Sequence, residues 1–327
     1  MVINNKETVC VVLVTFNRKK LLLECLEAIK KQTRPVDAIY IIDNTSQDGT
    51  PELLKSEGFI PTLPPSDLKE PYEIEYQVSN LIDGNLIRIY YVRMHENTGG
   101  AGGFSEGIKR AYGKNYDWLW LMDDDVEPVK NGLEKQISYS YISKCIHPSK
   151  KYINGNEFHW NALISERTGY IIANSWKFNN NIEWRDVNVG CFEGMLIHRT
   201  VVENIGFPDK KLFFVGDDTI YGYKIAKFTR NIHVKDIIFI KKLDNKPSKV
   251  FTYLLFRNYY VYIARMIAHN QLLWMIMLVF HTIKFIVKTM IKKNKGYNLN
   301  LIFPAFKGLL DGIFGIWGKE KDYLIKI

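Results

Sequence analysis

Three consecutive carboxylates, Asp123, Asp124 and Asp125, directly follow a run of bulky apolar residues at 118–122. Adjacent anions repel one another and gain nothing from burial unless a positive partner neutralises them. Mg²⁺ and Mn²⁺ bind carboxylate oxygens and usually complete their coordination with substrate phosphates. Asp123 and Asp125 therefore predict a metal–diphosphate site, because the alternative, a helix N-cap, would use only one or two of the three acids.

The pair Asp217 and Asp218 repeats this arrangement, since it follows the apolar segment 212–215. In such a pair one carboxylate can take a proton while its neighbour orients it or stays solvated, which makes the pair a candidate general base. A second set of metal ligands or the start of a helix would produce the same spacing. The sequence alone leaves these alternatives open.

A glycine-rich segment, NTGGAGGF at 97–104, precedes the three acids along the chain. Backbone N–H groups of such a segment can approach a phosphate or ribose closely, and the helix expected after it adds positive potential at its N-terminus. The spacing of the glycines fits neither a Walker A loop nor the dinucleotide-binding fingerprint. A tight turn without a ligand is the structural alternative.

These segments follow strands of a predicted α/β fold, in which a mostly parallel sheet is flanked by helices. The apolar patterns predict, in order, strand 9–15, helix 18–32, strand 37–43, a helix from 51, strand 87–93, a helix to about 112 and strand 118–122. Residues 58–86 are rich in proline and acid, so we expect an insertion or long loop there. Because such sheets bind ligands at the carboxyl ends of their strands, the polar segments should meet at one edge.

Composition and length limit the classes of protein that this chain can be. With 46% hydrophobic and 13% aromatic residues, the 327-residue chain is not disordered. We expect a catalytic domain over 1–245, divided near 130 into nucleotide and acceptor halves, and a helical region over 246–327. The net charge of +9 suits an anionic partner. The lysines gather beside apolar helices rather than beside the acids, which argues against a nucleic-acid partner.

The remaining bulk features concern the compartment and the membrane. Four scattered cysteines without zinc-like spacing predict a reduced, cytoplasmic setting, and no signal peptide is visible. The apolar stretch 272–283 has 12 residues, whereas a membrane span needs roughly 20. Lysines 284, 288, 292 and 293 recur at helical spacing, as in helices that lie on anionic lipid. We expect a peripheral protein on the inner face of the plasma membrane, with a buried helix as the alternative.

Taken together, the motifs resemble an inverting GT-A glycosyltransferase of family 2, in the bacterial galactofuranosyl- and rhamnosyltransferase-like branch. The resemblance covers residues 9–265, with a similar tail at 307–319, and the combination of TGGAGGF with MDDD is its specific part. The matching segments are VVLVTFNR at 11–18, IIDNTSQDGT at 41–50, ENTGGAGGFSEGI at 96–108, WLWLMDDDVEP at 118–128, GMLIHRTVVENIGFPDKKLFFVGDDTIYGYKI at 194–225 and YLLFRNYYV at 253–261. It implies a nucleotide-sugar donor, with UDP-galactofuranose favoured over dTDP-L-rhamnose, and a cell-surface glycan or lipid-linked glycan as acceptor.

The resemblance also implies a role for each matching residue. Asp123 and Asp125 would hold Mn²⁺ or Mg²⁺, and Asp218, beside Asp217, would deprotonate the acceptor hydroxyl. Attack at the anomeric carbon would invert its configuration while the cation stabilises the departing nucleoside diphosphate. The implied donor-binding residues are Thr15, Asn17, Asp43, Asn97, Gly99, Gly100, Gly102, Gly103 and Asp124, with Asp43 on the base. The candidate acceptor residues are Trp160, Glu193, Gly194 and Arg257, for which structural packing is the alternative.

Two positions depart from the pattern of this family. Ile220 stands where a further acid usually follows the Asp pair, and Lys241 or Lys242 stands where a metal-binding histidine is expected. Either His233 reaches the metal, or a lysine stabilises the diphosphate directly; otherwise His233 is an ordinary surface residue. These departures keep a non-catalytic, nucleotide-sugar-binding scaffold open as an alternative, and self-association is also left open.

Overall fold

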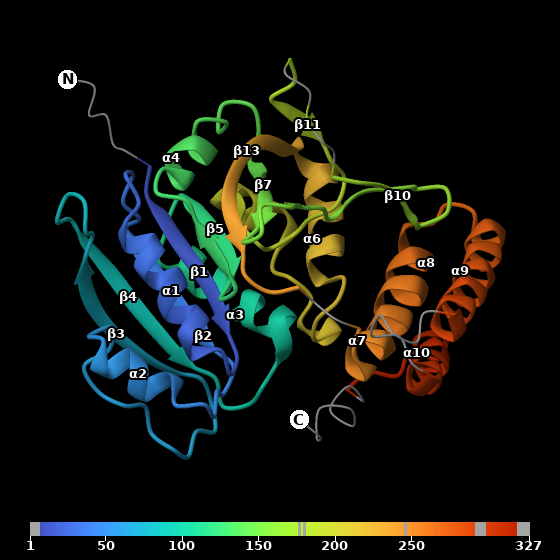
Figure 1. Ribbon diagram of the computed structural model, residues 1–327, viewed down its shortest axis with the longest axis horizontal. Helices are drawn as coiled ribbons and strands as arrows, with labels where there is room; N and C mark the ends of the chain where they lie inside the picture. The colour runs from blue at the N-terminus through green and yellow to red at the C-terminus, as the bar shows by residue number, and fades with distance from the viewer. Residues whose placement is uncertain (1–6, 176–177, 179–180, 245–246, 292–298, 319–327) are drawn as a thin grey trace.

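The computed structural model describes residues 7–175, 178, 181–244, 247–291 and 299–318. Its centre is a single large sheet in the strand order β11-β13-β7-β12-β5-β1-β2-β4-β3, with β6 paired to β13 and β8 to β7 (Figure 1). These strands are β1 Val9–Thr15, β2 Ala38–Asp43, β3 Tyr72–Ser79, β4 Leu86–Arg93, β5 Trp118–Asp123, β6 Val126–Pro128, β7 Cys145–Tyr152, β8 Glu157–Phe158, β11 Trp184–Asp186, β12 Met195–His198 and β13 Asn231–Lys241. A separate hairpin pairs β9 (Asn161–Ile164) with β10 (Ile171–Asn174).

Helices cover both faces of this sheet and continue beyond it. They are α1 Lys19–Lys30, α2 Thr50–Ser56, α3 Gly99–Gly113, α4 Gly132–Ile137, α5 Arg199–Ile205, α6 Asp217–Phe228, α7 Lys249–Leu254, α8 Ala264–Ile267, α9 Gln271–Ile291 and α10 Ile302–Ile313. Short helical segments are η1 Lys210–Leu212, the π-helical η2 Leu255–Ile263 and η4 Leu299–Leu301. The predicted α/β class is confirmed.

The four strands β4, β2, β1 and β5 are parallel, and they set the edge at which ligands bind. In the pairing register, Thr15 lies opposite Asp43 and Val14 opposite Asp123, so the ends of three strands are level with one another. The polar residues that follow these strands are therefore brought together, as predicted.

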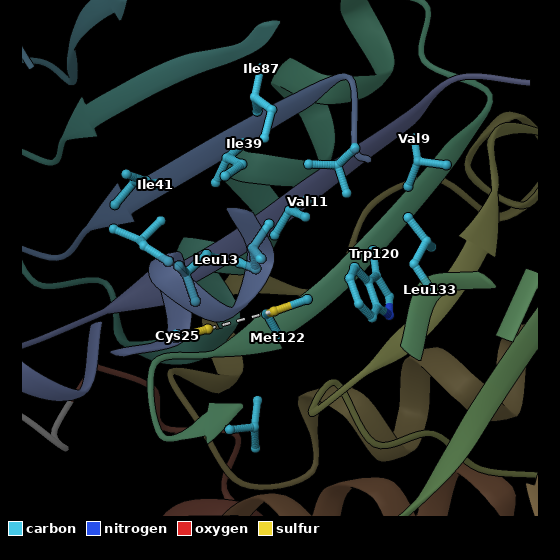
Figure 2. Close-up of a cluster of buried hydrophobic side chains, with 14 of the residues drawn as sticks. Val9, Val11, Leu13, Cys25, Ile39, Ile41, Ile87, Trp120, Met122 and Leu133 are labelled. Atoms are coloured by element: carbon cyan, nitrogen blue, oxygen red, sulfur yellow. Dashed lines mark hydrogen bonds between the residues drawn. The ribbon is translucent and has the colours of Figure 1, made fainter. Parts of the chain in front are cut away.

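Every residue of β1 is buried because helices cover both of its faces. Val11 and Leu13 point into the cluster shared with α1, where they pack with Ile39, Ile41 and Met122 (Figure 2). Val12 and Val14 point into the cluster shared with α3. A strand buried on both faces needs a continuous apolar run, which is the pattern that made it predictable.

The prediction of an insertion or long loop over 58–86 is wrong in its second half. Residues Tyr72–Ser79 form β3, which pairs antiparallel with β4 at the edge of the sheet. Only Ile74 of this strand is buried. An edge strand that is covered on one face only carries too few apolar residues to show a clear alternation.

The C-terminal helices lie together at the end of the molecule opposite β3 and β4 (Figure 1). Met277 and Leu278 of α9 and Leu309 of α10 pack around a shared core cluster that includes Trp274 and Val261. The 21-residue helix α9 contains an 18-residue window with a mean hydropathy of 1.6, of which 17% is buried. By length and composition alone, α9 could therefore cross a membrane. The apolar helix is longer than the 12-residue stretch suggested.

Candidate active site

A cavity of about 860 Å³ opens at the carboxyl ends of β1, β2 and β5. It extends across the N-termini of α3 and α6 to η2 and α9. The predicted residues that line it are Thr15, Asn97, Gly99, Gly100, Asp123, Asp124, Asp125, Trp160, Glu193, Asp217, Asp218 and Lys241. The other predicted residues, Asn17, Asp43, Gly102, Gly103, Gly194, His233, Lys242 and Arg257, are not among its lining residues.

The three carboxylates at the end of β5 meet basic side chains of this chain. Asp124 accepts hydrogen bonds from the Thr15 hydroxyl at 2.7 Å and from Arg18 at 3.1 Å. Asp125 pairs with Arg18 at 3.3 Å through one oxygen and with Lys241 at 2.7 Å through the other. Burial nevertheless raises the pKa of Asp124 to about 6, although Arg18 opposes this shift. Arg18, which the sequence interpretation missed, is thus a central cation of the site.

Lys241 joins the acids of β5 to a residue that we expected on the acceptor side. Its ammonium group lies 2.6 Å from Glu193 and 2.7 Å from Asp125, and its side chain is 1% exposed. Glu193 also pairs with the buried Lys150 at 3.4 Å. Although burial raises the pKa of a carboxyl group, Lys150 and Lys241 outweigh it and lower the pKa of Glu193. Lys242, by contrast, pairs with Glu24 and Glu127 away from the cavity.

One group of carboxylates among the described residues could hold a metal ion. Asp123, Asp125 and Glu193 each offer an oxygen, and these atoms lie within 4.8 Å of one another. Carboxylate oxygens suit Mg²⁺ or Mn²⁺. However, both oxygens of Asp125 and both of Glu193 already contact Arg18, Lys150 or Lys241. Of the three carboxylates, only that of Asp123 has no ion pair with a basic side chain of the described residues, so the group fits a divalent cation incompletely.

His233 does not belong to this group. It is 2% exposed, its Nε2 lies 3.0 Å from the Ser149 hydroxyl, and its ring contacts that of Trp160. Burial is the main reason that the pKa of His233 falls to about 3. It is therefore neither the surface histidine nor, in this geometry, the metal ligand that the sequence suggested.

Asp217 and Asp218 begin α6 and face the cavity from the other side. Burial and the charge of Asp218 raise the pKa of Asp217 to about 8, and burial raises the pKa of Asp218 to about 6. The pair therefore holds about one proton at neutral pH. The pair thus begins a helix and also lines the cavity, so these two alternatives do not exclude one another.

The loop before α6 is held by polar residues of η2 rather than by a ligand. The Asn258 side chain donates to the carbonyl groups of Leu212, Phe214 and Val215 at 2.7–3.1 Å. Arg257, a predicted acceptor residue, is fully buried, where its guanidinium donates to Asn258 and lies over the Trp317 ring. Its place in the core supports the packing alternative.

The glycine-rich segment is not a loop that precedes a helix, because α3 itself begins at Gly99. A Cβ on Gly102 would lie 2.3 Å from the Thr98 side chain, and one on Gly103 would lie 2.6 Å from that of Val14. Gly103 lets α3 pack against β1, and Gly102 leaves room for the Thr98 side chain one turn earlier, whereas Gly99 and Gly100 line the cavity. Only half of the predicted glycines face a ligand site.

Asp43, which was expected to bind the nucleotide base, is fully buried and braces the sheet edge. It accepts hydrogen bonds from Tyr91 at 2.7 Å and from Arg93 at 2.6 Å. Its neighbour Asn44 lines the cavity and donates to the Gly99 carbonyl at 3.0 Å. Asn17 accepts a hydrogen bond from the backbone N–H of Gln47 at 2.6 Å, which ties two loops together.

Aromatic side chains form the opposite end of the cavity. The aromatic and histidine residues that line this end are Phe158, His159, Trp160, Tyr170, Phe251, Tyr259, Tyr260 and His281. Rings of this kind stack on the apolar faces of sugars or on lipid chains. Gly194, also expected here, instead packs against Phe239 with φ +96° and donates its N–H to Leu121.

Comparisons with known proteins agree with this architecture. Residues 10–59 and 72–206 match the family described as Glycosyl transferase family 2. The galactofuranosyltransferase GlfT1 of Mycolicibacterium smegmatis is 27% identical over 224 residues, which cover 65% of this chain and 63% of that protein. GlfT1 of Mycobacterium tuberculosis is 30% identical over 215 residues, with coverage of 65% and 62%. The match thus spans less than two thirds of the length of these relatives.

Solved structures resemble the fold at low sequence identity. S. aureus TarS 1–349 in complex with UDP-GlcNAc has a TM-score of 0.56 at 14% identity and covers 94% of this chain and 81% of that one. The mannosyltransferase PcManGT of Pyrobaculum calidifontis, in complex with GDP-Man and Mn²⁺, has a TM-score of 0.53 at 14% identity, with coverage of 98% and 79%. At such identities the likeness concerns the fold alone, and it confirms the GT-A-type arrangement expected from the sequence.

Proposed function

This chain belongs to glycosyl transferase family 2, and we propose that it transfers a sugar from a nucleotide donor to a hydroxyl group of a glycan with inversion at the anomeric carbon. The observation that carries the proposal is the cavity itself. It holds the acids of β5, the glycine-rich start of α3 and the carboxylate pair of α6 in one space. A donor diphosphate can bind beside the first two because cations meet the acids there, and activation of an acceptor hydroxyl needs the third.

Asp218 is the proposed general base. Burial raises the pKa of both carboxyl groups, to about 8 for Asp217 and about 6 for Asp218, so the pair retains about one negative charge at neutral pH. Asp218 takes the proton of the acceptor hydroxyl as the oxygen attacks the anomeric carbon. The bond to the diphosphate breaks on the opposite side, and the nucleoside diphosphate leaves with the electron pair. Positive groups near the phosphates stabilise that charge.

UDP-galactofuranose is the preferred donor in this proposal. The names of the GlfT1 relatives support it, as does the TGGAGGF and MDDD combination. dTDP-L-rhamnose is the alternative donor, and a scaffold that binds the nucleotide sugar without turnover is the alternative role. Asp123, Asp125 and Glu193 would hold a divalent ion such as Mn²⁺ or Mg²⁺ if one bound, and it would supply positive charge beside the leaving diphosphate; ion pairs to basic side chains already occupy Asp125 and Glu193.

The exposed apolar surface of the C-terminal helices supports a peripheral location on the inner face of the plasma membrane, with a lipid-linked glycan as acceptor. Side chains at least 47% exposed include Ile276, Phe280 and Ile283 of α9 and Phe303, Phe306 and Leu310 of α10. Contiguous apolar surface of this kind marks membrane or protein contacts. The cavity reaches His281 of α9, so it extends toward this surface. Lys284 and Lys288 follow on the same helix, whereas Lys292 and Lys293 lie outside the described residues.

Sugar transfer from UDP-galactofuranose and from dTDP-L-rhamnose to a lipid-linked glycan primer tests the donor and the reaction together. We expect product with one donor only, and loss of product in Asp218→Asn with nucleotide binding retained. Nucleotide binding without turnover on any primer would favour the scaffold alternative. Flotation with vesicles of phosphatidylglycerol and phosphatidylethanolamine tests the location, and we expect a double change of Ile276→Lys and Phe303→Lys to abolish vesicle binding.

A further inference from the structure

The donor site already contains a buried cation that belongs to the chain. The side chain of Lys241 is 1% exposed, and its ammonium lies 2.7 Å from Asp125 and 2.6 Å from Glu193. These acids are two of the three that could hold a metal ion. An ammonium group at hydrogen-bond distance from both occupies the oxygens that a divalent ion would need.

The remaining oxygens of the same two acids also lie near basic groups, although Oε2 of Glu193 has no hydrogen-bond partner among the described residues. Arg18 lies 3.3 Å from the second oxygen of Asp125, and Lys150 lies 3.4 Å from the second oxygen of Glu193. A divalent ion that bound here in the usual way would have to displace basic groups that the fold holds in place. Tethered groups compete at high effective concentration, which disfavours the ion.

Lys241 is also placed to meet a donor phosphate. An ammonium group has three N–H donors, and two acceptors are found for that of Lys241 among the described residues. Lys241 and Arg18 line the same cavity as Gly99 and Gly100 at the positive end of α3. The Arg18 side chain is 39% exposed, so it presents a second cation to a ligand in the cavity. Three sources of positive potential thus line the cavity, beside the acids Asp123, Asp124, Asp125 and Glu193.

We propose that Lys241, assisted by Arg18, takes the place of the divalent cation as the counter-charge of the donor diphosphate. Donor binding and sugar transfer then proceed without metal. This inference rests on the proposed function, since it concerns the same site, and it changes which group neutralises the leaving nucleoside diphosphate. In this proposal the Lys241 ammonium group contacts a phosphate oxygen of the donor, so Lys241 acts directly on the phosphate.

The neighbouring lysine provides a matched control. Lys242 follows Lys241 in the sequence, but it pairs with Glu24 and Glu127 and does not line the cavity. Lys241→Met and Lys242→Met each remove one positive charge from the same short segment. A difference between them therefore reports position rather than net charge. Lys241→His introduces the residue that family 2 usually has near this position.

Calorimetry of the full chain with UDP and dTDP, in EDTA and in Mn²⁺, tests the proposal. We expect the wild-type affinity for one nucleotide to change by less than about threefold between the two conditions. Lys241→Met should lose about tenfold or more in EDTA, while Lys242→Met stays at the wild-type value. Nucleotide binding that requires Mn²⁺ would overturn this inference and leave the proposed function standing. Absence of binding to either nucleotide in both conditions would overturn both.

Binding of Mn²⁺ alone gives a second readout that does not depend on nucleotide or turnover. Without Lys241 the oxygens of Asp125 and Glu193 become available, so Lys241→His and Lys241→Met should bind Mn²⁺ at least about tenfold more tightly than wild type, as seen by electron paramagnetic resonance. Equal or tighter Mn²⁺ binding by the wild-type chain would contradict the proposal. The wild-type measurements need no variant, so they decide the question even if Lys241→Met does not fold.

Discussion

Among the glycines that line the cavity, Gly99 is expected to tolerate substitution least. It sets the distance between the start of α3 and the loop before α6. At Gly99 the backbone has φ +69°, and a Cβ there would lie 2.2 Å from the Phe213 carbonyl oxygen. The same carbonyl accepts a hydrogen bond from the N–H of Ala101 at 2.8 Å. The contact joins the start of α3, on the donor side, to the loop that leads into Asp217.

Gly99→Ala should therefore destabilise the protein and misplace Asp217 and Asp218, the proposed catalytic pair. The left-handed backbone costs an alanine about 1–2 kcal/mol, and relief of the steric overlap costs about 1–3 kcal/mol more. We expect a loss of about 2–5 kcal/mol in the free energy of unfolding. A shift of the pair by about 1 Å relative to the donor would lower kcat by about a hundredfold.

Gly113→Ala is the matched control at the other end of the same helix. No heavy atom lies within 4 Å of a Cβ at this position, and its φ is not in the left-handed region. Alanine should there stabilise the helix by about 0.5–1 kcal/mol. Urea unfolding followed by tryptophan fluorescence, together with the transfer assay, measures both variants. A Gly99→Ala protein within about 0.5 kcal/mol of wild type and fully active would refute the reasoning.

Three further predictions concern α6 and the loop before it. Asp218→Asn should lower kcat by about 10²–10⁴-fold with nucleotide affinity unchanged. The wild-type rate should fall below about pH 6 as Asp218 takes up a proton. An unchanged pH profile in Asp218→Asn would contradict the role of Asp218 as base. Because the pKa of Asp217 is raised to about 8 in the folded state, the native protein binds that proton more tightly than the unfolded chain. The stability that the protonated Asp217 carboxyl group contributes is therefore lost as pH rises toward 8. Asp217→Asn should flatten the dependence of unfolding free energy on pH. An unaltered slope would argue against a buried, protonated Asp217. Asn258→Ala should cost about 1–3 kcal/mol, because the carbonyl groups of Phe214 and Val215 lose the Asn258 donor and that of Leu212 keeps only Arg257, at 3.5 Å, among the described residues. Retention of wild-type stability in urea would show that water replaces the Asn258 side chain.

The sequence contained enough local information to predict the strands and the ends at which they meet. Continuous apolar runs such as Val9–Thr15 are typical of strands buried on both faces, and they end where polar or acidic residues begin. Since parallel strands share one carboxyl edge, these ends predicted the location of the cavity. Edge strand β3 escaped prediction, because a strand with Ile74 as its one buried residue has no strong pattern.

Residue types alone were a poorer guide to individual roles. Asp43, Gly102, Gly103, Gly194 and Arg257 match motifs, yet each of them packs or braces the fold outside the cavity lining. A sequence motif contains residues that contact the ligand and residues that support the fold around it, since a site needs both. The sequence by itself cannot separate the two.

What the sequence determined is the set of acids at the ends of strands and helices, because backbone periodicity is a local property. What only the tertiary structure decided is which cations meet those acids. Lys241 is 116 residues from Asp125 and 48 from Glu193 along the chain. They meet because the end of β13 pairs with β6, directly after the three carboxylates, with Lys241 opposite Val126. Pairing between distant strands follows from packing of the whole sheet, so no local pattern could show that the positive partner of Asp125 is a lysine of this chain.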